Sequence, residues 1–417
     1  MNYIVIPIFA DAYLHPLHKD NNLSLLFVKP LDGDSYFICQ SHPDCDIKNE
    51  DYKWLENETI ITPDTKKLLC VYPFKNVIDK NAEWWDVTGK PFDIESIRNN
   101  AIDFLNNKYY NVKRLNEIIP IVKHKEWCDE VVSKMMDESR SSDDILNYSK
   151  EASYAFLSIE KNGIKVTDNV CDIFDDRVKK HISDGKLYSN YNLWTSTGRP
   201  SNSFGSVNFA ALTKEQRKAF IPENDLLVEY DYDAYHLRLI GDFIGYKFPQ
   251  ASVHEYLASF YGSTYEESKQ ITFKLLYGGI DDTIRKNIPF FDKVQQFIDE
   301  KWSEYNRRNY VESDIYTRKL VKNNHVDMNS NKLFNYIIQS YETENNIKTI
   351  IELQQYLSNK RTKLVLYGYD SFTLDFNTID GVNTLKEVRK ILEKDRYLVK
   401  VVAGKNFGEL KLITERL

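Results

Sequence analysis

The stretch "LLVEYDYDAYHLRLIGDF" (residues 226–243) changes its side-chain pattern in the middle. Its apolar and aromatic opening predicts a buried strand, and the spacing of the apolar residues that follow predicts a helix. Asp231 and Asp233 stand two positions apart at the junction, and residues two apart on a strand share a face. We therefore expect both carboxylates to leave the strand end on the same side. Carboxylates gathered there without a partner cost free energy, so we expect them to bind a positively charged group or ion.

The bulk composition limits the classes of protein to consider. The 417 residues suffice for two or three domains, and 42% apolar with 28% charged residues is typical of a soluble globular protein. The net charge of −7 predicts no overall basic surface, so any binding of nucleic acid must rely on local patches or metal ions. The scattered cysteines have no CxxC spacing, which predicts neither structural zinc nor a disulfide framework and suits a reducing compartment.

The pattern along the chain predicts two parts. Residues 1–85 contain short β-branched and aromatic runs, and the pattern turns helical from residue 93. We interpret the start of the chain as a strand without a signal peptide, and no apolar run is long enough for a membrane span. The polar stretch "DESRSSDD" (137–144) is the candidate linker, and "EASYAFLSIEKNGIKV" (151–166) predicts a helix ended by Gly163 and then a strand.

Three further segments carry residues suited to chemistry. The loop "TSTGRPSNSFGSVNFAAL" (195–212) could set backbone N–H groups and Arg199 against phosphates, although alone it is better explained as a polar loop. In "SKQITFKLLYGG" (268–279), Lys269, Phe273 and Tyr277 lie along one side of a predicted helix, which alone is better explained by core packing. The run "TKLVLYGYDSFTLDF" (362–376) predicts a hairpin with Asp370 at its tip, where an aspartate is usually a turn former.

Taken together and in this order, these segments resemble family A DNA polymerases of the polymerase I and T-odd phage type. The collinear resemblance spans about residues 150–417. It is carried by seven segments: "LSIEKNGIKV" (157–166), "TGRPSNSFGSVNF" (197–209), "DYDAYHLRL" (231–239, motif A), "KQITFKLLYGG" (269–279, motif B), "NYIIQ" (335–339), "LYGYDSF" (366–372, motif C) and "VVAGKNFGEL" (401–410).

The resemblance implies roles for individual residues. Asp231 and Asp370, with the carbonyl of Tyr232, would hold two Mg²⁺ ions, or Mn²⁺ in their place. Two carboxylates about 4 Å apart repel by roughly 4 kcal/mol at an effective dielectric near 20, and divalent cations remove that repulsion. Lys269 would neutralise the nucleotide triphosphate and protonate the departing pyrophosphate.

The resemblance also implies contacts with nucleotide and DNA. Phe273 and Tyr277 would form the dNTP pocket, together with His236 and Tyr265. The primer–template would be contacted by Thr197, Arg199, Asn208, Asn335 and Gln339.

The chain departs from the family at the nucleotide pocket. His236 stands where the family has a glutamate that helps to exclude ribonucleotides, so His236 either takes part in sugar discrimination or is a structural histidine. Tyr265 stands where the family has an arginine. One phosphate-binding cation is therefore lost, unless Lys274 or Arg238 replaces it.

A third departure lies in motif C, where Ser371 replaces the family's auxiliary glutamate. Asp233 either compensates for it or is a solvated acid, and we favour the solvated acid.

The resemblance predicts a mixed α/β (α+β) fold with two domains. Residues 148–417 would form a palm with an antiparallel sheet and helical fingers at about 240–325. Only residues 167–194 separate "GIKV" from "TSTGR", so the thumb would be largely absent. Together with the net charge of −7, this predicts poor processivity unless a protein partner supplies the grip on the duplex. Residues 1–147 would form a degenerate RNase H-like 3′–5′ exonuclease domain without proofreading. Its first strand offers only Asp11, and Asp93-Ile94-Glu95 looks like the acidic start of a helix.

The leading interpretation is therefore a Mg²⁺-dependent, template-directed DNA polymerase that adds dNTPs to a primer 3′-OH. We expect a reduced phage or viral member of the family, located in the cytoplasm of the host, with no membrane partner. Two alternatives stay open. One is a template-independent or RNA-synthesising polymerase, and the other is a polymerase-derived DNA-binding accessory protein that has lost activity.

Overall fold

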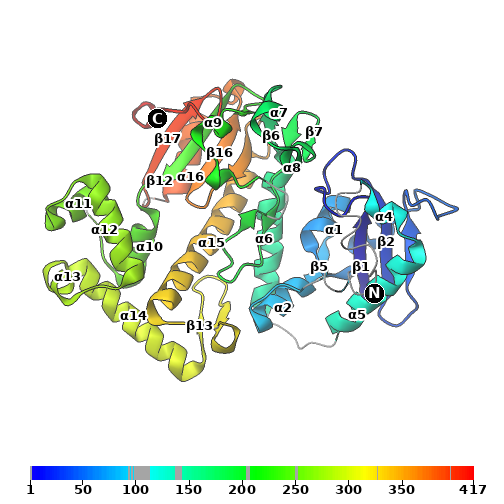
Figure 1. The fold of residues 1–417 in the computed structure, drawn as a ribbon, viewed down its shortest axis with the longest axis horizontal. Coiled ribbons are helices and arrows are strands. Elements are labelled where there is room, and N and C mark those ends of the chain that lie inside the picture. The colour runs from blue at the N-terminus through cyan, green and yellow to red at the C-terminus, as the bar shows by residue number, and fades with distance from the viewer. Residues whose placement is uncertain are drawn as a thin grey trace. The chain divides into compact units, whose positions relative to one another are not determined.

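The chain folds into two compact units in the computed structural model (Figure 1). The first unit comprises residues 1–194 and 201–221, and the second comprises residues 195–200 and 222–417. The structure describes residues 2–92, 94, 97, 113–136, 143–202, 207–248, 252–325, 327–394 and 396–417. The expected domain boundary between residues 147 and 148 falls inside one helix, α6 (Asp143–Asn162).

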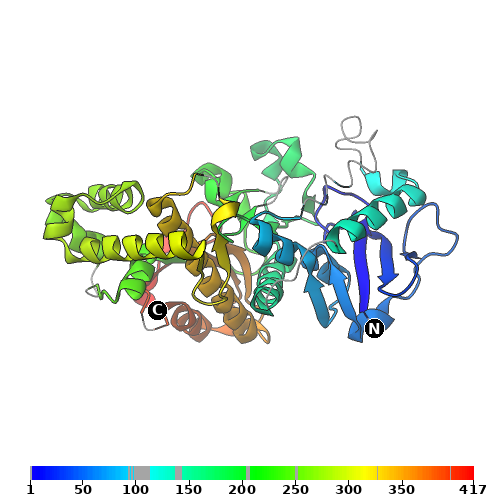
Figure 2. The ribbon, with the colours of Figure 1, turned by 90° about the horizontal axis from the view of Figure 1, so that it is seen from below.

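The first unit is built on a five-stranded sheet with the order β3-β2-β1-β4-β5 (Figure 2). β1, β2 and β3 are antiparallel neighbours, whereas β4 and β5 run parallel to β1. The strands are β1 (Asn2–Phe9), β2 (Leu23–Pro30), β3 (Tyr36–Cys39), β4 (Thr59–Thr62) and β5 (Asn76–Asp79).

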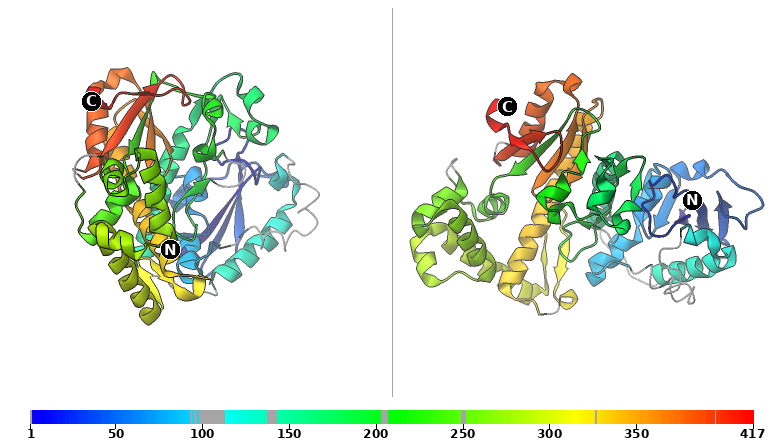
Figure 3. Two further views of the ribbon diagram at one scale, coloured as in Figure 1. Left: turned by 60° about the vertical axis from the view of Figure 1, so that its left-hand side comes forward. Right: turned by 45° about the horizontal axis from the view of Figure 1, so that its top comes forward.

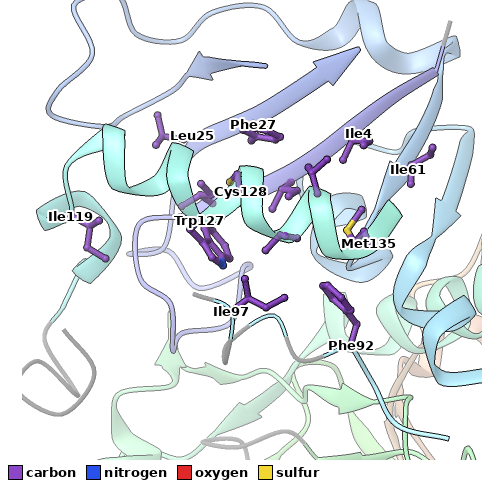
Figure 4. Close-up of a cluster of buried hydrophobic side chains, with 14 of the residues drawn as sticks. Ile4, Leu25, Phe27, Ile61, Phe92, Ile97, Ile119, Trp127, Cys128 and Met135 are labelled. Atoms are coloured by element: carbon purple, nitrogen blue, oxygen red, sulfur yellow. The ribbon is translucent and has the colours of Figure 1, made fainter. Parts of the chain in front are cut away.

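Alternate residues of β1 serve two apolar cores, as the twofold period of a strand requires. Ile4 and Ile6 face one core, to which Trp127 and Met135 of α5 (Ile121–Met136) contribute (Figure 4). Tyr3 and Val5 face the other core, which includes residues of α1 (Thr65–Val71) and of the 3₁₀ turn at Lys53–Asn57. Because both faces of the sheet are covered, its central strands are apolar along most of their length.

Shorter elements complete the first unit. A small sheet has the order β11-β6-β8-β7, and β9 pairs with β10. The remaining elements are α2 (Lys80–Thr88), α4 (Leu115–Ile118), β6 (Ile164–Val166), α7 (Val170–Ile173), α8 (Asp176–Lys179), β7 (Ile182–Ser183), β8 (Lys186–Leu187), β9 (Tyr191–Asn192), β10 (Ser201–Asn202), a 3₁₀ turn (Phe209–Ala211), α9 (Lys214–Arg217) and β11 (Phe220–Ile221).

A buried glutamate connects three parts of the first unit. Glu160 on α6 is 1% exposed, and its carboxylate forms an ion pair with Lys66 of α1 and lies 3.3 Å from His15. The same carboxylate accepts a hydrogen bond from the backbone N–H of Tyr191. Burial alone would raise the pKa of Glu160, but Lys66 and His15 outweigh it and hold this pKa below its usual value.

The second unit is built on an entirely antiparallel sheet with the order β15-β16-β12-β17-β18 (Figure 3). Its strands are β12 (Leu226–Tyr232), β15 (Lys363–Tyr367), β16 (Ser371–Phe376), β17 (Val399–Gly404) and β18 (Lys411–Leu412). Tyr230 and Tyr232 of β12 donate their hydroxyl hydrogens to carbonyl oxygens of α16 (Val382–Glu393). This face of β12 is therefore fixed on α16, and Asp231 points to the opposite face.

Helices make up most of the remainder of the second unit. They are α10 (Tyr235–Ile244), α11 (Val253–Tyr261), α12 (Tyr265–Gly278), α13 (Asp282–Asn287), α14 (Pro289–Arg308) and the long α15 (Ser330–Leu357). A hairpin of β13 (Tyr310–Glu312) and β14 (Lys319–Val321) and 3₁₀ turns at Lys322–Asn324, Thr378–Asp380 and Thr414–Arg416 complete it. A single apolar cluster joins α10, α11, α12, α14 and α15.

Several predictions from the sequence are confirmed. The strand and helix of residues 226–243, the hairpin around Asp370 and the helix ended by Gly163 all form. Most of the predicted linker and the Asp93 and Glu95 positions lie outside the described residues. Cys39 and Cys45 form a disulfide, which their spacing did not predict. Within the described ranges, no helix is long and apolar enough to cross a membrane.

Replacing Glu160 tests whether this buried carboxylate stabilises the first unit. Glu160→Ala leaves Lys66 without its anion in a buried place, so we expect the free energy of unfolding to fall by about 3–5 kcal/mol. Urea unfolding followed by tryptophan fluorescence measures this change, because every tryptophan except Trp302 belongs to the first unit. Glu126→Ala in the exposed pair with Lys123 is the control, with an expected change within about 0.5 kcal/mol.

Candidate active site

Two aspartates far apart in the sequence become neighbours through backbone pairing. In the register of β12 and β16, Asp231 lies opposite Ser371, the residue that follows Asp370. The backbone N–H of Tyr232 donates to the carbonyl oxygen of Asp370 at 2.9 Å, which attaches the hairpin tip to the end of β12. The strand pairing thus brings together the two acids that the sequence singled out.

The hairpin tip that carries Asp370 contains an unfavourable backbone conformation. Tyr369 adopts a left-handed conformation (φ 71°), which costs free energy for a bulky residue. The guanidinium of Arg199 stacks on the Tyr369 ring, 4.0 Å from its centroid, and so holds this turn. A Cβ at Gly368 would lie 2.5 Å from the Ser371 hydroxyl, so a larger residue there would force the Ser371 side chain to move.

Helix α12 supplies the expected cation and aromatic pair. It begins after Thr264, which forms a capping box with Glu267. The rings of Phe273 and Tyr277 stack with centroids 6.1 Å apart, because residues four positions apart lie on one side of a helix. Lys269 lies one turn before Phe273 on that same side.

These elements enclose a cavity of about 580 Å³ on the second unit. A volume of this size suits a small-molecule ligand. Most of the residues predicted from the sequence line it: Arg199, Asp231, Tyr232, His236, Tyr265, Lys269, Phe273, Tyr277, Asn335, Gln339 and Asp370. Other lining residues are Asp233, Ala234, Tyr235, Leu237, His254 and Lys400.

The two remaining predicted DNA contacts do not line the cavity. Thr197 is 7% exposed, and its carbonyl oxygen accepts hydrogen bonds from Arg318 and from the hydroxyl of Ser340. Thr197 therefore anchors the loop of residues 195–200 on α15. Asn208 belongs to the first unit, where it precedes the 3₁₀ turn at Phe209–Ala211 and is exposed.

The surroundings of Asp231 and Asp370 disfavour the negatively charged form of both side chains. Burial, the neighbouring Asp370 and Glu229 raise the pKa of Asp231 to about 7. Burial and Glu342 raise the pKa of Asp370 as well. Among the described residues, no side chain forms an ion pair with either carboxylate. The same residues contain no group of three or more His, Cys, Asp or Glu side chains arranged to hold a metal ion. Because both pKa values are raised and neither carboxylate has an ion-pair partner among the described residues, a bound cation would stabilise the charged forms of Asp231 and Asp370.

A buried glutamate that the sequence analysis missed organises the other side of the cavity. Glu342 on α15 has no exposed surface, and its carboxylate lies 3.1 Å from Nε of Arg199 and 3.2 Å from Nε2 of His236. Nδ1 of His236 forms a 2.7 Å hydrogen bond with the hydroxyl of Tyr277. Burial would raise the pKa of Glu342, but His236 and Arg199 hold it below its usual value. Glu342 therefore fixes His236, and His236 fixes Tyr277.

The spacing of polar residues along α15 could have indicated Glu342 from the sequence. Glu342 follows Asn335 and Gln339 at positions i, i+4 and i+7, so all three lie on one face of the helix. The side-chain amide of Gln339 donates to Asn335 at 3.0 Å, and both line the cavity.

Our preference for Asp233 as a solvated acid is wrong. Asp233 is 8% exposed, and its carboxylate binds Lys400 at 2.9 Å and Arg238 at 3.5 Å. The side chain of Arg238 also donates to the carbonyl oxygen of Asp233. The turn from β12 into α10 brings Arg238 to Asp233, whereas Lys400 reaches Asp233 from β17.

The fold is similar to that of a DNA polymerase domain. A solved structure described as the POL domain of Pol1 from M. smegmatis, in complex with DNA primer-template and dNTP, matches with a TM-score of 0.65. The match covers 97% of this chain and 95% of that chain at 13% sequence identity. No family model matches the sequence, and no curated protein matches it either.

The raised pKa of Asp231 makes stability depend on pH. Since the folded, metal-free protein binds this proton more tightly than the unfolded chain does, its free energy of unfolding should fall as the pH rises from about 4 to about 7. The Asp231→Asn variant lacks this charge. We therefore expect its free energy of unfolding to exceed that of the parent protein by about 2–4 kcal/mol at pH 8 and to equal it near pH 4. Urea titrations in a chelator measure the difference. Asp299→Asn on α14, an exposed position, should follow the parent at both pH values.

Glu342 can be tested in the same way. Glu342→Ala leaves Arg199 without its carboxylate partner, so we expect a loss of about 3–5 kcal/mol in the free energy of unfolding. Urea unfolding followed by circular dichroism measures it, with the exposed Glu300→Ala on α14 as control. A loss no greater than that of the control would contradict the buried ion pair.

Proposed function

We propose that the protein is a template-directed DNA polymerase that adds dNTPs to a primer 3′-OH, as a reduced member of family A. The observation that carries this proposal is the convergence of Asp231, Asp370 and Lys269 on one cavity from β12, the β15–β16 hairpin and α12. The similarity in fold to a polymerase domain that was solved with primer-template and dNTP supports it.

The carboxylate pair fits the Mg²⁺ ions that such a reaction requires. Asp231 and Asp370 offer hard oxygen ligands, have no ion-pair partner among the described residues, and have raised pKa values that a bound cation would lower. The carbonyl of Tyr232 is a further candidate ligand. When bound, two Mg²⁺ ions supply stabilisation of the attacking and leaving oxygens of an in-line displacement.

The other residues of the cavity bind and orient the substrates. Lys269 lies on the wall of the cavity, where its ammonium can neutralise phosphate oxygens and donate a proton to the leaving pyrophosphate. The stacked Phe273 and Tyr277 offer flat apolar surfaces to a base. Asn335 and Gln339 present side-chain amides at the same cavity, as contacts for the primer–template.

The first unit is proposed to be an exonuclease-like domain without proofreading. Its sheet combines three antiparallel strands with two parallel ones, in the order β3-β2-β1-β4-β5, and this mixed sheet supports the proposal. Asp11, the acid nearest the end of β1, uses its carboxylate to accept backbone hydrogen bonds from Tyr13, Leu14 and Arg114. A carboxylate occupied in this way stabilises a turn and is poorly suited to hold a metal ion.

The thumb is proposed to be largely absent, which leads to a proposal about partners. Residues 167–194 form only short elements, from α7 to β9, which supports this proposal. The whole chain has a net charge of −7, which weakens its attraction for DNA phosphates. A protein partner is therefore proposed to supply the grip on the duplex that the thumb provides in larger relatives.

Primer extension by the full chain tests the proposal. With primer–template, Mg²⁺ or Mn²⁺ and dNTPs, we expect extension directed by the template. Asp231→Asn and Asp370→Asn should each lower the rate by at least about 10³-fold, because each removes a carboxylate that stabilises the reacting oxygens. Asp299→Asn should retain the parent rate.

The same assay separates the alternatives. Extension with rNTPs, or without regard to the template, would identify the RNA-synthesising or template-independent enzyme. Absence of extension by the parent protein, together with retained DNA binding, would identify the accessory protein. Unchanged extension by either asparagine variant would contradict the proposed site.

A further inference from the structure

The first residue of α12 supplies no positive charge to the cavity. Tyr265, the first residue of that helix, stands where the resemblance predicted an arginine. Neither substitute suggested by the sequence fills the gap. Arg238 is only 9% exposed and is bound to Asp233, and Lys274 is exposed outside the residues that line the cavity.

Lys400 of β17 lies at this gap. In the register of β12 and β17 it stands directly opposite Asp231, and directly paired residues of antiparallel strands project from the same face. Its ammonium nitrogen is 5.9 Å from the centroid of the Tyr265 ring. Lys400 thus faces the cavity from the sheet, whereas Lys269 faces it from α12.

The partners of Lys400 leave a positive charge for a ligand. Its ammonium binds Asp233, but that carboxylate is also bound by Arg238, so one negative charge is shared by two cations. The side chain of Lys400 is 53% exposed, so its ammonium is accessible to a ligand while Asp233 keeps its contact with Arg238. Arg199, the remaining Arg or Lys side chain of the lining, is neutralised by Glu342.

We propose that Lys400 is the second cation that binds the triphosphate of the incoming nucleotide, in place of the arginine absent at Tyr265. This inference rests on the proposed function, because it assumes that the cavity takes a nucleoside triphosphate. Lys269 and Lys400 then hold the phosphate chain from opposite sides, and Asp233 positions Lys400 for this contact.

Nucleotide binding by the full chain tests the role of Lys400. The dissociation constants of dNTP, dNDP and dNMP are measured by calorimetry in the presence of Mg²⁺, for the parent protein and for Lys400→Met and Lys400→Gln. A charge-assisted contact predicts that dNTP binding weakens by roughly 10- to 100-fold in both variants. The loss should shrink as phosphates are removed from the ligand, and Lys400→Arg should restore dNTP binding.

Two controls separate this contact from a structural effect. Both uncharged variants leave Asp233 paired with Arg238, so they should fold, and circular dichroism with urea unfolding verifies that. Lys411→Met on β18 removes an exposed lysine of the same sheet outside the cavity and should bind dNTP as the parent does.

The outcomes distinguish this inference from the proposed function. Parent-like dNTP binding by both uncharged variants overturns the role of Lys400, even where the parent extends primers. If dNTP binding depends on Lys400 but the parent does not extend primers, the triphosphate site is supported and the proposed polymerase activity is contradicted. Failure of the parent to bind dNTP overturns both.

Discussion

The candidate site depends on the position of β12 in the middle of its sheet. Hydrogen bonds to β16 on one side and β17 on the other fix the register of this strand completely. That register places Asp231 beside the Asp370 hairpin and opposite Lys400. A shift by one residue would turn Asp231 toward α16 and empty the site of its central carboxylate. Tyr230 and Tyr232 oppose such a shift, because their hydroxyls are bound to α16.

The acids of the cavity fall into two groups by their counter-charges. Asp233 is shared by Lys400 and Arg238, and Glu342 is shared by Arg199 and His236. Asp231 and Asp370 have no such partners among the described residues, and their pKa values are raised. Of these four acids, Asp231 and Asp370 are therefore the two with capacity for an external cation.

Two positions of the cavity, His236 and Tyr265, are connected to residues on other elements. His236 is bound to Glu342, a buried carboxylate on α15 behind the lining of the cavity. The Tyr277 hydroxyl is therefore oriented by an imidazole that a buried acid holds. At Tyr265, the cation that α12 lacks has a candidate replacement in Lys400 of β17. In both places, a local change in the sequence is accompanied by a residue from a distant segment.

The sequence by itself determined the local elements and the chemical identity of most site residues. Alternating and helical patterns act over a few residues, so the strand at 226–232, the helix at 265–278 and the Asp370 hairpin were predictable. Only the tertiary structure decided which charges meet. Glu342 pairs with Arg199 across 143 positions, and Lys400 reaches Asp233 from a strand far along the chain. Such pairs depend on sheet register and helix packing, which leave no periodic signal in a single sequence.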